Sequence, residues 1–579
     1  MHQLMNAHRL IFALVVSCAI TSCSKSAEID STDSGLLQYV PADTPYLFSS
    51  LEPLPDEVMD KMEPIIELSL KGYADVLRAI ANEEIEKAEE EGEVDGETLS
   101  RLQAIGNEIA SLLSIEGLNN AGIDRNSLMV IYGEGLLPVF RMRLTDGALM
   151  EQAIARIEEK AGSKMATGKI DDQSYRYAGD DDAFIIVALV GNDLVITMLP
   201  AVHSDDLLKS VLGLNKPAKS MAESGGAKAL IAKNNYEPYF LFFIDFTRIV
   251  STFLDEQSGS NAELLALTEY DPSTLSDVCK AEIRDMAGIV PRMTAGYTKI
   301  STHEMSSAAT LEVREDIAAG LATLVAPVQG LGLTKGGLFS FGMSLDVLAA
   351  REFYSSRLDA MEADPYECEL FAELQAGVEQ GRELLKQPIP PIAYSVKGFL
   401  AVIDALEGMD LVSQQPPTSV DASFLLATDN PQGLVAMGAL FSPEIAALDL
   451  QADGKPQQLN LPPISPALSE AHIAMTEDSL VISVGEGGAD RIVEMLKAGY
   501  AEPPPSMSMF MDAGRYYGFV ADLMMLAPPT EEDASPELTA AMAEMTHSME
   551  DWFDEISVSI SLTDRGVELE STVTFAEEE

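Results

Sequence analysis

Residues 183–200 read AFIIVALVGNDLVITMLP, two apolar runs on either side of a short polar break. The run from Ala183 to Val190 and the run from Leu194 to Leu199 each have the length of a strand. Gly191-Asn192-Asp193 between them is a turn sequence typical of a β-hairpin. This stretch therefore predicts two neighbouring antiparallel strands.

Helical segments follow the predicted hairpin. We expect helices from Asp205 to Leu212 and from about Thr247 to Leu254. Because most strands form adjacent pairs and the helices lie between these pairs, the pattern favours an α+β fold over a strictly parallel α/β fold.

The same features recur in the same order further along the chain. Asn192 to Ile196 in the hairpin matches Asp478 to Ile482. The other matches are Leu47-Phe48-Ser49 with Leu338-Phe339-Ser340, Thr145-Asp146 with Thr428-Asp429, Phe243 to Arg248 with Phe510 to Arg515, and Ala308 to Val313 with Glu570 to Phe575. Collinear matches with drifting offsets are what duplication followed by changes in loop length produces. We therefore predict two tandem pseudo-repeats of antiparallel sheet with packed helices.

The predicted repeats divide the chain at about residue 320. The first repeat spans residues 37–320 with a helical insertion at 56–115, and the second spans residues 321–579 with a helical insertion at about 349–385. Four apolar residues in the first insertion keep helical spacing: Leu102, Ile105, Ile109 and Leu112. A chain of 579 residues is long for one core, which agrees with this division.

The N-terminus combines a positive charge, an apolar run and a cysteine. Arg9 precedes the run from Leu10 to Ala19, which is too short for a permanent membrane span. Ile20-Thr21-Ser22-Cys23 follows, and it resembles the lipobox of bacterial lipoproteins. The resemblance implies a signal peptide over residues 1–22 and acylation of Cys23, palmitate included. An ordinary signal peptide with an incidental cysteine is the alternative.

The residues after Cys23 bear on the location of the protein. In lipoproteins of this kind an aspartate after the cysteine favours retention at the inner membrane, and Ser24 stands there instead. The resemblance therefore implies the outer membrane, facing the periplasm, with the outer leaflet of the inner membrane as the alternative. Residues 23–36 would form a polar tether. Pro41 to Pro45 resembles the opening strand of other uncharacterised secreted bacterial proteins, for which no activity is known.

The charge balance limits the partners of the chain. There are 93 acidic and 37 basic residues, a net charge of −56, and such a surface excludes nucleic acid as a partner. The acidity indicates either a solvated surface in salt or a site for cations or basic partners. The first interpretation is favoured because the acidic residues are spread along the chain. A hydrophobic content of 47% is ample for a packed globule.

Two cysteines are expected to remain in the chain after processing of the N-terminus. Cleavage removes Cys18 and acylation occupies Cys23, which leaves Cys279 and Cys368 in an oxidising compartment where disulfides persist. A disulfide between these two residues and two separate thiols are both compatible with the sequence, because spacing along the chain does not establish the distance between their Cα atoms.

We find no recognisable catalytic residues, and we predict no metal site and no cofactor. Ser340 lies in a stretch that lacks the first glycine of a nucleophile elbow, and we interpret it as a strand residue. His303-Glu304 lacks the second histidine of a zinc protease motif. The histidines of the mature chain are scattered: His203, His303, His472 and His547.

Three further motifs have structural and functional interpretations. Gly485-Glu486-Gly487-Gly488 precedes a predicted helix, and we favour a tight connection over anion binding. Met507, Met509 and Met511 could bind Cu(I), but their counterparts in the first repeat are Phe240, Phe242 and Ile244, so we expect these positions to face a core. Asp245 with Arg248, and Asp512 with Arg515, we interpret as helix caps.

These features favour a non-enzymatic lipoprotein with a binding or envelope-maintenance role. Its partners would be the membrane, through the N-terminal lipid, and a periplasmic protein or a lipid or peptide ligand. The alternative is an envelope hydrolase whose active residues converge only in three dimensions. A pocket that holds Ser or Asp beside a histidine would favour the hydrolase, whereas an apolar groove would favour the binding protein.

Overall fold

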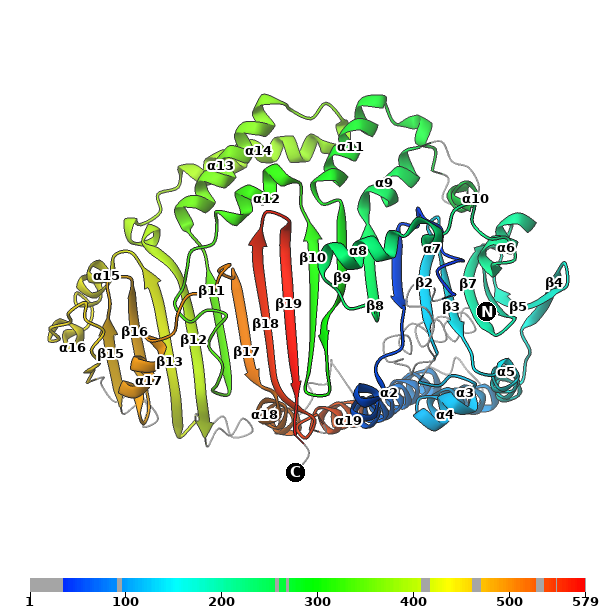
Figure 1. Cartoon of the computed structure of the whole chain (residues 1–579), viewed down its shortest axis with the longest axis horizontal. Coiled ribbons are helices and arrows are strands. Elements are labelled where there is room, and N and C mark those ends of the chain that lie inside the picture. Colours follow the sequence, from blue (N-terminus) through cyan, green and yellow to red (C-terminus); the bar gives the residue numbers. More distant parts are fainter. Residues whose placement is uncertain are drawn as a thin grey trace. The chain divides into compact units, whose positions relative to one another are not determined.

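The computed structural model describes residues 35–90, 96–125, 127–255, 260–266, 270–407, 417–460, 470–526, 536–547 and 549–577. These residues form helices and antiparallel sheet, so the predicted α+β fold class is confirmed (Figure 1). The chain divides into two compact units. The first comprises residues 1–274, 292–305 and 528–549, and the second comprises residues 275–291, 306–527 and 550–579.

The sheet of the first unit has the strand order β4-β5-β6-β7-β3-β2-β1-β8-β9, with every neighbouring pair antiparallel. Its strands are β1 Tyr46–Ser50, β2 Met129–Glu134, β3 Leu137–Arg143, β4 Ala166–Ile170, β5 Gln173–Gly179, β6 Ala183–Val190, β7 Asp193–Pro200, β8 Phe240–Asp245 and β9 Arg292–Ile300. The hairpin predicted at residues 183–200 is confirmed as β6 and β7.

The helices of the first unit include the segment in which the sequence predicts an insertion. They are α2 Asp56–Glu90, α3 Gly96–Leu112, α4 Ile115–Asn120, α5 Gly147–Ala161, α6 Asp205–Leu212, α7 Met221–Ser224, α8 Gly226–Asn234, α9 Phe246–Leu254, α10 Ser260–Ala266 and α19 Pro536–His547. Local signals set the ends of α6: the Ser204 side chain accepts a hydrogen bond from the Leu207 N–H, and Gly213 adopts the left-handed conformation that ends the helix.

The sheet of the second unit has the strand order β14-β15-β16-β13-β12-β11-β17-β18-β19-β10. Its strands are β10 Glu304–Glu312, β11 Phe339–Ser344, β12 Val396–Glu407, β13 Ser419–Thr428, β14 Gln457–Gln458, β15 Ala471–Met475, β16 Ser479–Val484, β17 Met507–Asp512, β18 Phe553–Thr563 and β19 Gly566–Phe575. Its helices are α11 Asp277–Ile289, α12 Glu315–Ala322, α13 Val347–Ala363, α14 Ala372–Lys386, α15 Pro431–Gly438, α16 Pro443–Ala446, α17 Gly488–Met495 and α18 Ala513–Leu526.

Strand order shows the internal duplication. The order β6-β7-β3-β2-β1-β8-β9 in the first unit corresponds to β15-β16-β13-β12-β11-β17-β18 in the second. The registers agree along this path. In the first unit, the residues paired across successive neighbouring strands are Val195, Arg141, Val130, Ser49 and Leu241. In the second unit, the residues paired in the same way are Val481, Leu425, Leu400, Gly342 and Ser508, in the same order.

Two predicted matches between the repeats are displaced. The registers equate Arg141 with Leu425, which moves Thr145-Asp146 by one residue relative to Thr428-Asp429. The registers equate Ser49 with Gly342, two residues beyond the Ser340 that the sequence comparison indicates. A shift of two residues leaves every side chain of a strand on the same face. The apolar alternation is therefore equally good in both alignments, and only the hydrogen-bonded neighbours distinguish them.

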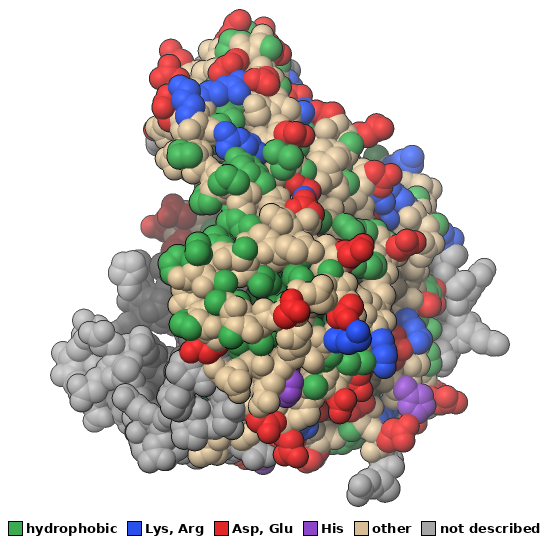
Figure 2. All heavy atoms as spheres, turned by 90° about the vertical axis from the view of Figure 1, so that its left-hand side faces the viewer, with side chains coloured by type: hydrophobic (Ala, Val, Ile, Leu, Met, Phe, Trp, Pro, Cys, Tyr) green, Lys and Arg blue, Asp and Glu red, His purple; other side chains and the backbone are tan. Residues whose placement is uncertain are grey.

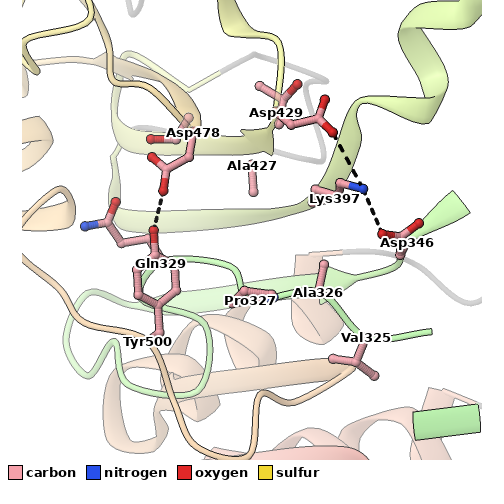
Figure 3. Close-up of a pocket in the computed structure, with 12 residues that line it drawn as sticks. Val325, Ala326, Pro327, Gln329, Asp346, Lys397, Ala427, Asp429, Asp478 and Tyr500 are labelled. Atoms are coloured by element: carbon pink, nitrogen blue, oxygen red, sulfur yellow. Dashed lines mark hydrogen bonds and ion pairs between the residues drawn. The ribbon is translucent and has the colours of Figure 1, made fainter. Parts of the chain in front are cut away.

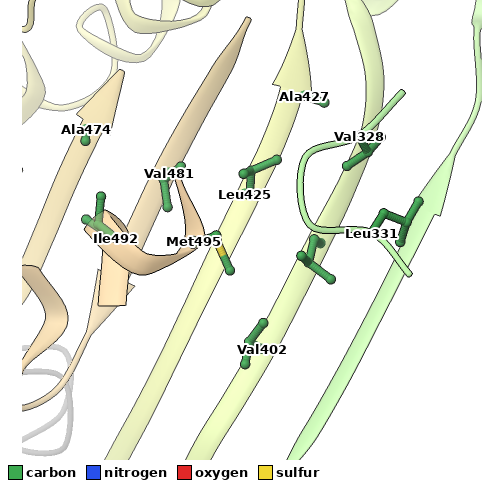
Figure 4. Close-up of a cluster of buried hydrophobic side chains, with 10 residues drawn as sticks. Val328, Leu331, Val402, Leu425, Ala427, Ala474, Val481, Ile492 and Met495 are labelled. Atoms are coloured by element: carbon green, nitrogen blue, oxygen red, sulfur yellow. The ribbon is translucent and has the colours of Figure 1, made fainter. Parts of the chain in front are cut away.

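The main core of the second unit lies on one face of its sheet (Figure 4). Side chains from β12, β13, β15 and β16 pack there against α17 and against the segment before β11. The buried residues are Val328, Leu331, Leu400, Val402, Leu425, Ala427, Ala474, Val481, Ile492 and Met495. None of the described helices combines the length and apolarity needed to cross a bilayer.

Candidate functional site

The second unit contains a cavity of about 570 Å³ with charged groups on two sides (Figure 3). On one side the Lys397 Nζ lies 2.7 Å from an Asp346 oxygen and 3.8 Å from an Asp429 oxygen. On the other side the Tyr500 hydroxyl donates a hydrogen bond of 2.5 Å to Asp478. The cavity thus holds three carboxylates and one ammonium group.

The polar groups of this cavity are already engaged. Asp346 accepts hydrogen bonds from the Leu348 and Ala349 N–H groups at the start of α13. Burial opposes its ionisation, but Lys397 and these N–H groups outweigh burial and lower the pKa of Asp346. Burial, together with the bond to Asp478, raises the pKa of Tyr500 to about 12, so this phenol stays protonated at neutral pH.

This cavity does not have the composition of a hydrolase site. A serine nucleophile needs a base within hydrogen-bond reach, and no histidine is among the residues that line the cavity. Ser479 lies at its wall, but the Ser479 hydroxyl is hydrogen-bonded to Thr476 at 2.7 Å. The criterion that would favour the alternative, a pocket with Ser or Asp beside a histidine, is not met at this place.

A histidine does lie beside serines elsewhere, beneath α17. His472 on β15 pairs with Ser483 on β16, and the hydroxyl of Ser423 donates to that of Ser483 at 2.9 Å. Ser483 has no exposed surface, and the Arg491 guanidinium lies 3.3 Å from its oxygen. A substrate could not reach this hydroxyl, so the cluster is part of the interior.

Arg491 also explains the glycine-rich turn before α17. Its guanidinium donates hydrogen bonds to the carbonyl oxygens of Val484 and Glu486. Gly485 and Gly487 both have positive φ, and a Cβ on Gly485 would lie 2.0 Å from an Asp421 oxygen. The carboxylates of Asp404 and Asp421 lie near the guanidinium and would repel an anion. The turn is therefore a tight connection, as the sequence analysis favours.

Both predicted helix caps are present. Asp245 accepts a hydrogen bond from the Arg248 N–H at 3.1 Å, and Asp512 caps α18 in the same way. Burial opposes ionisation of Asp245, but hydrogen bonds from Thr247, Arg292 and the Arg248 N–H outweigh it and lower the pKa of this carboxyl. Both aspartates are structural, as expected.

The prediction that the three methionines of β17 face a core is wrong. Met507, Met509 and Met511 are only partly buried, and the core side of this strand holds Phe510, whose exposed fraction is 3%. Met509 pairs with Phe341 on β11 and with Val558 on β18. The methionines therefore lie on the sheet face opposite the core.

This opposite face is apolar across five strands, and we name it the Phe/Met face. Registers place its side chains on one side of β13, β12, β11, β17 and β18. They are Phe339, Phe341, Met343, Phe399, Ala401, Ile403, Phe424, Leu426, Met507, Met509, Met511, Ile556, Val558 and Ile560. Each is a hydrocarbon, aromatic or thioether group, without charge or strong hydrogen-bonding capacity.

Exposure separates the two faces of the sheet. Phe424 is 41% exposed and Met343 is 42% exposed, whereas Leu425, the neighbour of Phe424 in the chain, has no exposed surface. Aromatic rings form a row across this face. The rings of Phe341 and Phe399 lie 5.9 Å apart, and those of Phe399 and Phe424 are stacked at 5.8 Å. At one end of the face the Tyr516 ring of α18 stacks on the Phe339 ring, with the two ring centroids 6.2 Å apart, so this side chain is partly covered.

Cys279 on α11 and Cys368, just before α14, are joined by a disulfide. Glu282 on α11 reinforces this junction, because its carboxylate accepts hydrogen bonds from the Glu367 N–H at 2.8 Å and the Cys368 N–H at 3.0 Å. The predicted signal peptide, Cys18 and the predicted lipidation site Cys23 lie outside the described residues.

Among the residues that the structure describes, no group of three or more His, Cys, Asp or Glu side chains is arranged to hold a metal ion. Neither the Phe/Met face nor the cavity around Lys397 is apparent from the sequence. Comparison with protein-family models, with curated proteins and with solved structures finds no match to this chain.

Proposed function

We propose that this chain is a lipid-anchored protein of the bacterial envelope that binds the hydrocarbon chain of a lipid on the Phe/Met face. The observation that carries the proposal is the row of half-exposed aromatic and thioether side chains opposite the buried core. A soluble protein rarely leaves so continuous an apolar surface in water unless the surface contacts a partner. Phenylalanine and methionine suit a ligand of variable shape, because methionine adapts to irregular neighbours.

A hydrocarbon chain fits this face better than a peptide does. A peptide that binds by strand addition needs an edge strand with free N–H and C=O groups. The three strands β11, β12 and β17 that carry most of the Phe/Met face are each paired on both sides. A hydrocarbon chain needs no hydrogen bonds, and its burial contributes about 25 cal/mol for each Å² of apolar surface removed from water.

The proposed location rests on the resemblance of Ile20 to Cys23 to a lipobox. Replacement of Cys23 by serine is expected to abolish incorporation of radiolabelled palmitate and to release the chain from membranes, because no acyl chains would remain to hold it. Membrane fractionation and lipid labelling in the producing bacterium measure both effects. Labelling and membrane association that persist in Cys23→Ser would contradict the proposal.

The proposed ligand is tested with a fluorescent fatty acid titrated into the purified chain. Phe424→Ser removes the most exposed aromatic ring of the row, and we expect it to weaken binding about tenfold, because burial of a Phe side chain contributes roughly 1.5–3 kcal/mol. Phe253→Ser is the matched control, since Phe253 is 37% exposed but belongs to α9 of the first unit. Equal affinities of the two variants, or no saturable binding by the unaltered chain, would refute the proposal.

A further inference from the structure

The helices α15 and α16 form a short hairpin with an unusually apolar surface. Residues 431–448, which we name the apolar hairpin, contain one charged side chain, Glu444. The turn between its helices carries Leu440 and Phe441, which are 80% and 85% exposed, and Met437 nearby is 40% exposed. Figure 2 looks onto the side of the molecule where these helices lie and shows hydrophobic side chains gathered on it.

The base of the apolar hairpin is well anchored. Ile445 and Leu448 pack against the buried cluster of Leu459, Ala471 and Ile473. The Ser442 side chain caps α16, and its hydroxyl also donates a hydrogen bond of 2.8 Å to Glu444. The turn is thus held in place by its own unit, while Leu440 and Phe441 project from it with most of their surface in water.

Around the turn of the hairpin, the exposed side chains lack the polar groups by which proteins usually recognise one another, whereas the polar Gln432 is exposed at the start of α15. Protein interfaces combine an apolar centre with a polar rim and about one hydrogen bond per 100–200 Å². The exposed apolar side chains here have no donor or acceptor, and they are Ala436, Met437, Leu440, Phe441, Pro443, Ala446 and Ala447. The acyl chains of a bilayer form no hydrogen bonds, so a protruding apolar turn inserts among them without the need for donors or acceptors.

We infer that the turn of the apolar hairpin inserts into a lipid bilayer, with Leu440 and Phe441 reaching the boundary between headgroups and acyl chains. The charge of the hairpin and of the whole chain indicates which lipid headgroups the turn contacts. The hairpin has no Lys or Arg, and the chain as a whole has a net charge of −56, so anionic headgroups would repel it. The surface that it fits is zwitterionic. This contact is additional to a lipid on Cys23 and independent of ligand binding by the Phe/Met face.

Quenching by brominated lipid tests the inference. The chain contains one tryptophan, Trp552. In a Trp552→Phe background, Phe441→Trp places the sole reporter at the turn, and the purified full chain is mixed with phosphatidylcholine vesicles whose acyl chains carry bromine. We expect a blue shift and quenching of the emission. Val202→Trp in the same background is the control, because Val202 is 84% exposed in the first unit, and its emission should stay unquenched.

A second measurement uses substitutions at the turn. In a Cys23→Ser chain, Leu440→Ser and Phe441→Ser are each expected to weaken sedimentation with phosphatidylcholine vesicles about tenfold, whereas Val202→Ser has no effect. Both experiments add vesicles to purified chain, so they do not depend on acylation or on fatty-acid binding. Emission of the Phe441→Trp variant that stays unquenched, or that shifts only as the protein concentration rises, would overturn the inference, the latter by indicating a second copy as the partner.

Discussion

Replacement of both Cys279 and Cys368 by serine is expected to lower the free energy of unfolding of the second unit by about 4 kcal/mol. The two cysteines are 89 residues apart in the chain, and the entropy that a cross-link removes from the unfolded state grows with the length of the loop it closes. The loop contains α12, β11 and α13, so the unfolded chain without the bond has many more conformations available to it. Denaturant titration, followed by the midpoint and slope of unfolding, measures the loss.

Reduction provides the control for this prediction. The unaltered chain in excess dithiothreitol should unfold at the same denaturant concentration as the Cys279→Ser, Cys368→Ser chain in either redox condition. If the oxidised and reduced chains unfold within about 0.5 kcal/mol of each other, the disulfide does not stabilise the unit in the manner proposed. The hydrogen bonds of Glu282 would then be sufficient to hold the junction.

Removal of the carboxylate of Asp193 is expected to cost about 3–5 kcal/mol of stability in the first unit. Arg141 is completely buried, and its guanidinium lies 3.1 Å from Asp193 and 3.9 Å above the Tyr39 ring. It also donates a hydrogen bond of 2.6 Å to the Leu212 carbonyl oxygen. In Asp193→Ala the guanidinium would remain buried without a counter-charge, which is the costly arrangement. Thermal and denaturant unfolding measure the effect.

Replacement of the other partner of this ion pair, Arg141, is the informative control. The second repeat has Leu425 at the position of Arg141, so a leucine is compatible with this place in the sheet. In Arg141→Leu the carboxylate of Asp193 keeps its ion pair with Arg143, which is partly exposed. We therefore expect Arg141→Leu to cost clearly less than Asp193→Ala. Equal losses would show that the cost does not arise from an unpaired buried cation.

Patterns within a short stretch of sequence predicted the local structure well. The hairpin of β6 and β7 follows from two apolar runs and a turn sequence. The caps at Asp245 and Asp512 follow from a carboxylate placed just before a helix, because the hydrogen bond it accepts comes from a residue only three positions further on. The duplication was detectable because these local features recur in order.

The Phe/Met face could not be identified in this way. Phe424 and Leu425 are adjacent and both apolar, yet one is 41% exposed and the other has no exposed surface. Alternation along a strand separates two sets of side chains, but when both sets are apolar it does not reveal which set is covered by the rest of the fold. The position of α17 against β13 and β16 determines this, and that contact joins distant segments.

The sequence by itself determined the elements, the repeat and the extreme acidity of this protein, because each depends on composition or on neighbours within a few residues. The tertiary structure alone decided which sheet face is buried, where Leu440 and Phe441 project, and that Cys279 meets Cys368. It also assembled the cavity around Lys397 from separate segments. These properties depend on how residues far apart in the chain pack against one another, and patterns within a short stretch of sequence carry no information on that packing.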